Sequence, residues 1–473
     1  MTGALAHYLE AALAGAPPLA ASDGTAIAAG ALHELAREIA GELAGIAPDE
    51  PVLVAIANEP GDLARLLGVW LAGGVAVPVA ADAAPATMQA LEAATGARLR
   101  LARGGTERIG GVPPPARDLL RDAALVIFTS GSTGRPKGVV IGHAPMAAKL
   151  GVLQRLVGLA PGDRVLVPLR LTFIFGLWVS LLALAARARL VLVPRFTTAG
   201  VAQDLAGGAT VLAAVPTMLR ALVAEAAPPA PALRLILTGG ETLGVALGAR
   251  LRASLPQAGI CDLYGLTETG SCDFCLRPAE HEAGAGSIGS PTEQVTFRLL
   301  TPEGRPAAEG ADGELAVRTP FGMLGYLDDP DLTARSHSDG FFRTGDLARL
   351  RPDGRVEIVG RLKDIVSRGG NKISPAEIDA LIASHPDVAA ALCAGVPDAR
   401  LGEALHAVVV PRAGARIEPE ALRRWLAERT ERYKVPDAIH VRDSLPVGST
   451  GKVRRTGVAE LARDGSGPDG GGR

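Results

Sequence analysis

Residues 125–143 read LVIFTSGSTGRPKGVVIGH, and the interpretation of the whole chain starts from this stretch. An apolar run typical of a buried strand enters a loop of Thr, Ser and Gly that reaches Lys137. Such a loop can offer backbone N–H groups, hydroxyls and an ammonium group to a polyphosphate. It is not a Walker A loop, because Lys137 is followed by Gly138 rather than by Ser or Thr. We therefore expect a phosphate-binding loop at residues 129–138.

Short apolar runs alternate with helical stretches on both sides of this loop, from about residue 25 to 215. The predicted strands cover residues 52–58, 75–81, 125–130, 164–169, 189–194 and 210–216. Continuous apolar strands between helices are typical of parallel sheets that are covered on both faces. From about 285 to 360, turn signals such as TPEG and RPDG separate short alternating strands, which predicts antiparallel hairpins.

The predicted fold class is therefore α/β, with a large N-terminal domain and a small C-terminal domain. The large domain would contain two parallel-sheet α/β subdomains and a small β-barrel-like subdomain. The helical and strand-like segments after residue 363 predict a small, mobile α+β domain. We expect domains at residues 1–362 and 363–464, and a disordered tail at 465–473.

The composition excludes several classes of protein. The 473 residues carry a formal net charge of −2, so neither a nucleic-acid partner nor a polybasic membrane arm is indicated. The longest uncharged apolar run, residues 171–186, has 16 residues, fewer than the roughly 18–20 of a membrane span, so we expect a buried helix. Four cysteines make no disulfide scaffold, and the N-terminus lacks a basic signal region. We expect a cytoplasmic protein.

Four further motifs follow the loop in order: YGLTETG at 264–270, GFFRTGDLARL at 340–350, GRLKDIVSRGGNKISPAEID at 360–379 and LPVGSTGKVRR at 445–455. With these motifs the chain resembles the adenylate-forming superfamily of acyl-CoA synthetases, adenylation domains and luciferases over about residues 25 to 460. The resemblance implies that ATP activates a carboxylic acid to acyl-AMP with release of pyrophosphate. The acyl group would then pass to the thiol of CoA, as in an AMP-forming acid–thiol ligase.

The resemblance also implies roles for single residues around ATP and Mg²⁺. The phosphate loop would be formed by Thr129, Ser130, Gly131, Ser132, Thr133, Gly134 and Lys137. Glu268 would bind Mg²⁺, since a hard carboxylate suits that ion beside phosphate oxygens, and Thr267 would contact the α-phosphate. The adenosine would be bordered by Gly239, Gly240, Glu241, Tyr264, Gly265, Asp346 and Arg361, with Asp346 accepting the ribose hydroxyls.

Two further segments would serve catalysis and the second half-reaction. Lys452 would be the adenylation catalyst, bridging the substrate carboxylate and the α-phosphate. Lys363 would be the hinge about which the C-terminal domain rotates between half-reactions. Gly369, Gly370 and Lys372 would then face the thiol site, where the glycines allow a pantetheine arm to pass closely.

The expected acyl pocket is apolar. Its lining candidates are Phe173, Phe175, Gly176 and Val215, for which plain core packing is an equal alternative. No acid occurs between Asp163 and Asp204, so the carboxylate that amino-acid-activating relatives use to hold an α-amino group is absent. An apolar or aromatic carboxylic acid is therefore favoured.

The acceptor, however, stays open at this point. The chain could load CoA, a phosphopantetheine thiol on a carrier protein, or an amine to form an amide. A remote alternative is a non-catalytic nucleotide-binding relative. The implied cofactors are ATP, Mg²⁺ and CoA (or phosphopantetheine), and the oligomeric state cannot be predicted. We expect Cys272 and Cys275, a C-x-x-C pair, to be structural or pocket-wall residues, with a redox role as the alternative.

Lysine usage marks the same motifs. Of 48 basic residues only six are lysines, which leaves 42 arginines. Four of the six lie in the motifs above: Lys137, Lys363, Lys372 and Lys452. A compact ammonium on a flexible stem suits a phosphate loop better than the planar fork of arginine does. The other two, Lys149 and Lys434, are expected at the surface.

Overall fold

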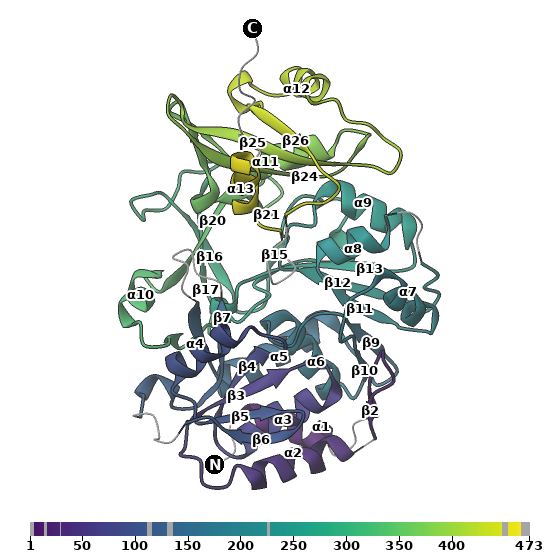
Figure 1. Cartoon of the computed structure of the whole chain (residues 1–473), viewed down its shortest axis with the longest axis vertical. Coiled ribbons are helices and arrows are strands. Elements are labelled where there is room, and N and C mark those ends of the chain that lie inside the picture. The colour runs from purple at the N-terminus through teal and green to yellow at the C-terminus, as the bar shows by residue number, and fades with distance from the viewer. Residues whose placement is uncertain are drawn as a thin grey trace. The chain divides into compact units, whose positions relative to one another are not determined.

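The computed structural model describes residues 4–13, 17–28, 30–110, 116–129, 136–224, 228–446 and 453–464 (Figure 1). The chain divides into two compact units. The first comprises Met1–Leu243, Leu247–Phe297 and Val317–Phe342, and the second comprises Gly244–Ala246, Arg298–Ala316 and Arg343–Arg473. The expected domain boundary at residue 362 stays a prediction, and the expected tail at 465–473 lies outside the described residues.

The first unit contains a nine-stranded sheet in the order β15-β14-β13-β12-β11-β9-β10-β1-β2. The strands are β1 (Leu19–Ala21), β2 (Ala26–Ile27), β9 (Arg164–Val167), β10 (Arg189–Leu192), β11 (Val211–Ala214), β12 (Leu235–Gly239), β13 (Gly259–Tyr264), β14 (Phe274–Leu276) and β15 (Ser290–Pro291). Adjacent strands in this order are parallel from β13 across to β1. At the two edges, β14 and β15 on one side and β2 on the other are paired antiparallel to their neighbours. Strands β9, β10 and β11 correspond to the strands predicted at 164–169, 189–194 and 210–216.

A seven-stranded sheet, ordered β18-β8-β7-β4-β3-β5-β6, also belongs to the first unit. Its strands are β3 (Pro51–Ile56), β4 (Val75–Ala80), β5 (Leu99–Ala102), β6 (Gly105–Arg108), β7 (Ala123–Thr129), β8 (Lys137–Gly142) and β18 (Gly325–Tyr326). The central strands β7, β4, β3 and β5 are parallel, and β7 and β8 form an antiparallel hairpin. The phosphate loop therefore connects the two strands of this hairpin.

In the first unit, α1, α2, α3, α5 and α6 share one apolar core with both sheets, whereas α7, α8 and α9 pack in a second cluster of buried residues. The helices are α1 (Ala4–Leu13), α2 (Ala31–Glu42), α3 (Pro60–Leu71), α4 (Pro85–Thr95), α5 (His143–Val157), α6 (Ile174–Ala185), α7 (Thr198–Ala206), α8 (Pro216–Leu222), α9 (Val245–Ser254) and α10 (Pro330–Arg335). Val54 of β3, Val165 of β9, Leu150 of α5 and Leu181 of α6 are buried together in this core. Such a core needs helices that are apolar on most sides, as α6 is.

The apolar run at 171–186 forms the buried helix α6 of 12 residues, as predicted. Among the residues that the structure describes, no helix is both long and apolar enough to cross a bilayer.

The antiparallel region folds as a sheet with the order β16-β17-β20-β19, and β21 also pairs with β20. The strands are β16 (Thr296–Leu300), β17 (Gly313–Arg318), β19 (His337–Ser338), β20 (Phe341–Leu350) and β21 (Val356–Arg361). The predicted hairpins are confirmed, but the expected barrel-like closure is wrong, since within the described residues the strand order has free ends. The two-residue edge strand β19 is too short to close a ring against β16.

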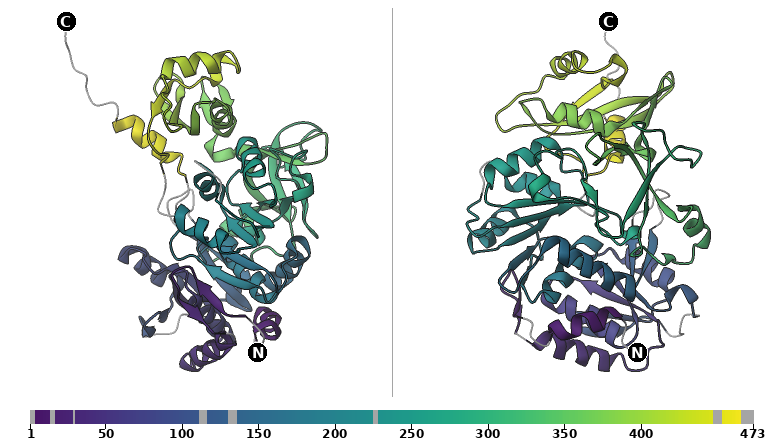
Figure 2. Two further views of the ribbon diagram at one scale, coloured as in Figure 1. Left: turned by 90° about the vertical axis from the view of Figure 1, so that its right-hand side faces the viewer. Right: turned by 180° about the vertical axis from the view of Figure 1, so that it is seen from behind.

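A five-stranded sheet forms the core of the C-terminal segment. Its strands are β22 (Val366–Arg368), β23 (Asn371–Ile373), β24 (Val388–Asp398), β25 (Gly402–Pro411) and β26 (Ala438–Val441), and its helices are α11 (Pro375–Ala383), α12 (Pro419–Ala427) and α13 (Thr456–Asp464). Side chains alternate along β25: Leu405 packs with α11 and α12, whereas Val408 packs with Val458 of α13. The helices therefore cover opposite faces of the sheet, and Figure 2 shows α13, in yellow, apart from α11 and α12.

Candidate active site

The phosphate loop is held by the β7–β8 hairpin. Thr129 is the last residue of β7, Lys137 is the first of β8, and the two face each other in register. Ser130, Gly131, Ser132, Thr133 and Gly134 lie outside the described residues. The hairpin fixes both ends of the loop, and β7 delivers its first end at the carboxyl edge of the parallel strands, where ligands commonly bind.

Lys137 and Glu268 both contact one tyrosine, Tyr326. Tyr326 lies on β18, which pairs with β8. Its hydroxyl donates to Oε1 of Glu268 at 3.1 Å, and the Lys137 ammonium lies 5.5 Å from the centre of its ring. Burial, together with the charge of Glu268, raises the pKa of Tyr326, so the hydroxyl stays protonated as a donor. A cation and a carboxylate that lie far apart in sequence are thereby placed beside the phosphate loop.

Tyr326 was not predicted from the sequence. The available signal was weak: this tyrosine, one of four in the chain, lies between the motifs at 264–270 and 340–350 and belongs to neither. Its relevance depends on the pairing of β18 with β8, which is a long-range contact.

Thr267 and Glu268 lie on a short 3₁₀ turn, Thr267–Thr269, after β13. The turn is tied to the strand region of Tyr326, because the N–H of Met323 donates to the carbonyl of Glu268 at 2.8 Å. Gly265 allows the chain to fold back on itself, since a Cβ at this position would lie 2.2 Å from the backbone nitrogen of Cys272. Both predicted residues are thus carried on one tightly folded loop.

The residues expected near the adenine end two neighbouring parallel strands. Gly239 is the last residue of β12 and pairs with Leu263 of β13. Tyr264 ends β13, and its ring packs edge-on against Phe274 with centroids 5.9 Å apart. Gly240 follows β12, and Glu241 accepts hydrogen bonds from the N–H and hydroxyl of Thr217 at the start of α8. Contact with adenine stays a prediction for all four residues.

The acyl-pocket candidates lie at the starts of two helices. Phe173 precedes α6, Phe175 and Gly176 belong to its first turn, and Val215 precedes α8. Phe175 and Val215 are partly buried against the shared core, and the Phe175 ring lies 5.6 Å from that of Trp178. Core packing therefore accounts for part of their surface, and a role in acid binding stays a prediction.

Within the second unit, Asp346 and Arg361 form a cross-strand ion pair. They are register partners on β20 and β21, and the Arg361 Nε lies 2.8 Å from Oδ1 of Asp346. Asp346 is only 3% exposed, whereas the Arg361 side chain is about half exposed. Two residues predicted to bind the nucleotide therefore lie side by side.

The expected second-step segment is an exposed hairpin. Gly369 and Gly370 connect β22 to β23, and both have positive φ, 53° and 86°, as a two-residue hairpin turn requires. Lys372 donates to the hydroxyl of Ser367 across this hairpin. Lys363, the predicted hinge, is exposed on the 3₁₀ turn Leu362–Asp364. The structure thus places these residues at the surface of the second unit.

Lys452 lies outside the described residues, but the chain just after it is firmly anchored. Arg455 donates to Oδ2 of Asp379 on α11 at 2.6 Å and to the carbonyl of Cys393, and its Nε lies 3.6 Å from Asp364. The terminal motif is therefore connected by charge to the residue that follows Lys363.

Lysine placement corrects one prediction and qualifies another. Lys149 is not at the surface: its side chain is only 1% exposed, on α5 within the core. The expectation failed because amphipathic patterning treats any lysine as a polar face residue. Lys434 is partly covered and forms ion pairs with Glu377 and Glu431 at 2.7 and 3.1 Å.

The cysteines are all free and buried. The sulfurs of Cys261 and Cys275 lie 3.6 Å apart. Among the described residues, no group of three or more His, Cys, Asp or Glu side chains could hold a metal ion. A Mg²⁺ ion would thus need ligands from a substrate, and a single carboxylate plus phosphate oxygens is its usual environment. Glu268, with one oxygen on Tyr326, fits that role.

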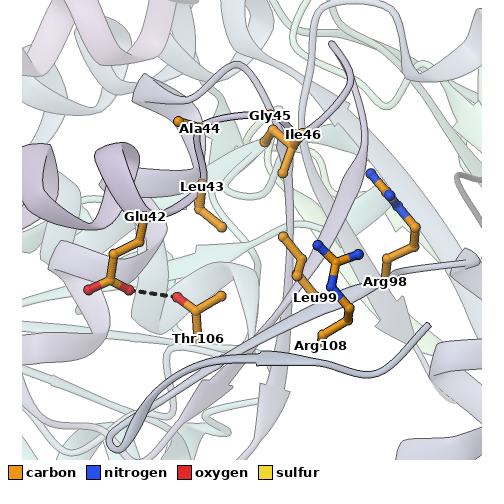
Figure 3. Close-up of a pocket in the computed structure, with 9 residues that line it drawn as sticks. All are labelled: Glu42, Leu43, Ala44, Gly45, Ile46, Arg98, Leu99, Thr106 and Arg108. Atoms are coloured by element: carbon orange, nitrogen blue, oxygen red, sulfur yellow. Dashed lines mark hydrogen bonds between the residues drawn. The ribbon is translucent and has the colours of Figure 1, made fainter. Parts of the chain in front are cut away.

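Two cavities lie away from these residues. One of about 230 Å³ lies between the end of α2 and strands β5 and β6, where Arg98 and Arg108 point toward it (Figure 3). The Arg98 guanidinium donates two hydrogen bonds, of 2.8 and 2.7 Å, to the carboxylate of Glu50. The other, of about 480 Å³, lies at the carboxyl ends of β3, β4 and β5. None of the predicted site residues lines either cavity.

Comparison with known proteins identifies the family of this chain. The family described as "AMP-binding enzyme" matches residues 104–327, and its C-terminal domain matches residues 377–452. A feruloyl-CoA synthase of an Amycolatopsis species is 32% identical over 464 residues, which cover 91% of this chain and 93% of that enzyme. The chain belongs to the AMP-binding enzyme family. It is thus a member of the adenylate-forming superfamily that the motifs indicate.

Solved structures of this family share the fold. ATP-bound MatB from Rhodopseudomonas palustris has a TM-score of 0.86 at 26% identity, covering 98% of this chain and 99% of MatB. The amide bond synthetase McbA from Marinactinospora thermotolerans has a TM-score of 0.85 at 27% identity, covering 97% and 99%. Several curated relatives of this chain are CoA ligases. Together with the family match, they show that this AMP-binding protein is an AMP-forming acid–CoA ligase.

Proposed function

We propose that this protein activates an apolar or aromatic carboxylic acid with Mg·ATP and transfers the acyl group to CoA. In the first step a carboxylate oxygen attacks the α-phosphorus, the bond to the β-phosphate breaks, and pyrophosphate leaves with acyl-AMP remaining. In the second step the thiol sulfur of CoA attacks the acyl carbon, AMP leaves, and the thiol proton is lost. Chemistry of this kind depends mainly on positioning and charge neutralisation.

The observation that carries the proposal is the Lys137–Tyr326–Glu268 arrangement. Lys137 at the end of the phosphate loop would neutralise the β- and γ-phosphates. Glu268 would hold Mg²⁺ together with phosphate oxygens, and the Tyr326 hydroxyl, 3.1 Å away, would orient its carboxylate. A fixed cation and a fixed carboxylate beside a Gly/Ser loop are what a polyphosphate with a bound divalent ion needs.

The acid is inferred from α6 and its surroundings. Phe173 and Phe175 at the start of this helix offer an apolar surface, and no carboxylate is available nearby in sequence for an α-amino group. The name of the feruloyl-CoA synthase relative refers to an aromatic acyl group, which agrees with this inference. We further propose a cytoplasmic location, supported by four buried free thiols.

ATP–pyrophosphate exchange with a panel of acids tests the first step. We expect exchange with ferulate or another apolar acid and none with L-phenylalanine. Glu268→Gln should abolish exchange, whereas the matched change Glu282→Gln, at an exposed acid of the same unit, should leave it unchanged. Absence of exchange with every acid would contradict the proposal and favour a nucleotide-binding protein without catalysis.

The acceptor is tested by supplying CoA, a holo-carrier protein or an amine to the acyl-AMP-forming enzyme. A second candidate, amide formation, has support from the amide bond synthetase McbA, which matches nearly the whole chain. Release of acyl-CoA at a rate far above the other two products would support the ligase. Amide as the main product would overturn the CoA assignment but not the first step.

Two lysines separate the half-reactions in this proposal. Lys452→Ala should abolish exchange yet leave transfer from supplied acyl-AMP largely intact, because this ammonium acts between carboxylate and α-phosphate. Lys363→Pro should keep exchange and block thioester formation, because a fixed φ would prevent rotation at the exposed turn. Equal loss of both half-reactions in Lys452→Ala, or normal thioester turnover in Lys363→Pro, would contradict these roles.

A further inference from the structure

Lys149 is an ionisable side chain in the core that the proposed reaction does not use. It is only 1% exposed, on α5, where Met146, Leu150 and Leu153 are also buried. Transfer of an ammonium group from water to an apolar interior is strongly unfavourable unless the group is paired and hydrogen-bonded. The interactions of Lys149 must therefore offset a substantial penalty.

Lys149 interacts with groups on or beside the loop that follows Glu268. Its Nζ donates to the carbonyl of Cys272 at 2.8 Å and lies 3.9 Å from Oδ1 of Asp273. It also lies 5.1 Å from the ring centre of Phe321, within the range of a cation–π contact. One buried charge thus connects helix α5 to residues 272 and 273.

The loop in turn carries this connection back to the 3₁₀ turn. The other oxygen of Asp273 accepts the hydroxyl of Thr269, the last residue of the turn that contains Glu268. The N–H of Asp273 donates to the carbonyl of Tyr264 at 2.7 Å, and the N–H of Ser271 donates to the carbonyl of Leu266 at 2.8 Å. Residues 264–273 therefore form a closed hydrogen-bonded loop with Lys149 behind it.

The backbone of this loop is strained where Lys149 holds it. Ser271 and Cys272 have φ values of 67° and 51°, the left-handed region that side chains other than glycine rarely adopt. Such a conformation is strained, and it persists only where its surroundings determine it. The hydrogen bond from Lys149 to the Cys272 carbonyl acts directly on the second of the two.

We propose that Lys149 is a positioning residue for the metal site, holding the 264–273 loop so that Glu268 can meet Mg²⁺ and the phosphates. Lys149 acts from behind the loop and Tyr326 acts on the carboxylate itself. Lysine suits this position better than arginine, because a slender stem can cross the core and place one compact charge at its end. This inference rests on the proposed role of Glu268.

Metal binding without turnover tests the proposal. The probe is Mn²⁺, titrated by electron paramagnetic resonance in the presence of α,β-methylene-ATP, whose bridge between the α- and β-phosphates cannot be cleaved, so that no acyl-AMP forms. Loss of a residue that orients a metal ligand typically weakens metal affinity by about 10- to 100-fold. We expect Lys149→Met to weaken Mn²⁺ binding by about tenfold or more, while Lys434→Met, a lysine of the second unit, leaves it unchanged.

Asp273→Asn and the double variant Lys149→Met/Asp273→Asn separate positioning from charge balance. Removal of one partner leaves an uncompensated buried charge, whereas removal of both can be nearly neutral for stability. We expect the double variant to recover the melting temperature but not the Mn²⁺ affinity. Recovery of both to within twofold of the wild-type affinity would show a purely structural pair and overturn the proposal, even if Lys149→Met alone fails to fold.

Glu268→Gln in the same titration distinguishes the two possible failures. Unchanged Mn²⁺ affinity in Glu268→Gln would remove the proposed metal role and with it the basis for the inference. Weakened affinity in Glu268→Gln with normal affinity in Lys149→Met would leave the proposed function in place and refute the role of Lys149.

Discussion

Replacement of Tyr326 by phenylalanine is the sharpest single test of the site geometry. The change removes one oxygen, whose hydroxyl donates to Oε1 of Glu268 at 3.1 Å. The ring itself is only 4% exposed and packs in the core, so its apolar contacts remain. The substitution therefore changes the orientation of a carboxylate with little change in packing.

The magnitude follows from the hydrogen bond that is lost. A hydrogen bond to a charged group contributes about 1.5–3 kcal/mol, and Glu268 is half-buried, which favours the lower end. Since 1.36 kcal/mol corresponds to a factor of ten, we expect roughly a tenfold effect. The effect should fall on metal binding, because the carboxylate is the ligand and the tyrosine only orients it.

Pyrophosphate exchange measured across a range of Mg²⁺ concentrations is the assay. Tyr326→Phe should raise the half-saturating Mg²⁺ concentration by about tenfold and change the rate at saturating Mg²⁺ by less than about threefold. Tyr8→Phe, which removes a hydroxyl from α1 of the same unit, is the matched control and should behave as wild type. A Tyr326→Phe enzyme with the same Mg²⁺ dependence as Tyr8→Phe would refute the reasoning.

Three further predictions concern stability and nucleotide binding. Gly265→Ala should lower the free energy of unfolding in urea by about 1–3 kcal/mol, because the new Cβ would lie 2.2 Å from a backbone nitrogen. The control Gly162→Ala adds its Cβ in open space and should leave the free energy of unfolding unchanged. Equal values for the two variants would contradict this reasoning. Burial lowers the pKa of His143 to about 4, so as the pH falls this histidine binds a proton in the unfolded chain before it does so in the folded protein. The wild type should therefore lose about 2 kcal/mol more stability than His143→Gln between pH 7 and 5. Parallel stability curves for the two proteins over this pH range would contradict the prediction. Asp346→Asn should raise the KM for ATP by about tenfold; an unchanged KM would remove Asp346 from nucleotide binding.

Much of the candidate site could be predicted from local patterns. The loop at 129–138 is contiguous, so its phosphate-binding chemistry can be recognised without knowing what lies beside it. The RPDG turn likewise predicts the hairpin of β20 and β21. Its register alone would place Asp346 opposite Gly360, and a register shift between Leu347 and Ala348 places it opposite Arg361 instead. Local turn chemistry therefore predicts the hairpin but not this pairing.

Tyr326 and Lys149 could not be found in this way. Tyr326 reaches Glu268 across 58 residues, and Lys149 reaches Cys272 across 123, so their roles depend on which strands and helices become neighbours. The expected barrel failed for a related reason: turn signals predict hairpins, whereas closure depends on how the outermost strands meet. Sequence patterns report periodicity and turns, and they carry little information on contacts between distant elements.

The six lysines show both sides of this division. The sequence by itself determined that Lys137, Lys363, Lys372 and Lys452 belong to motifs, because compact cations recur where a contiguous loop or turn needs them. Only the tertiary structure decided that Lys149 is a core residue, because burial is a property of the surrounding elements. A lysine looks the same in sequence on a surface and in a core, and the free energy of its burial is balanced only by partners that folding brings to it.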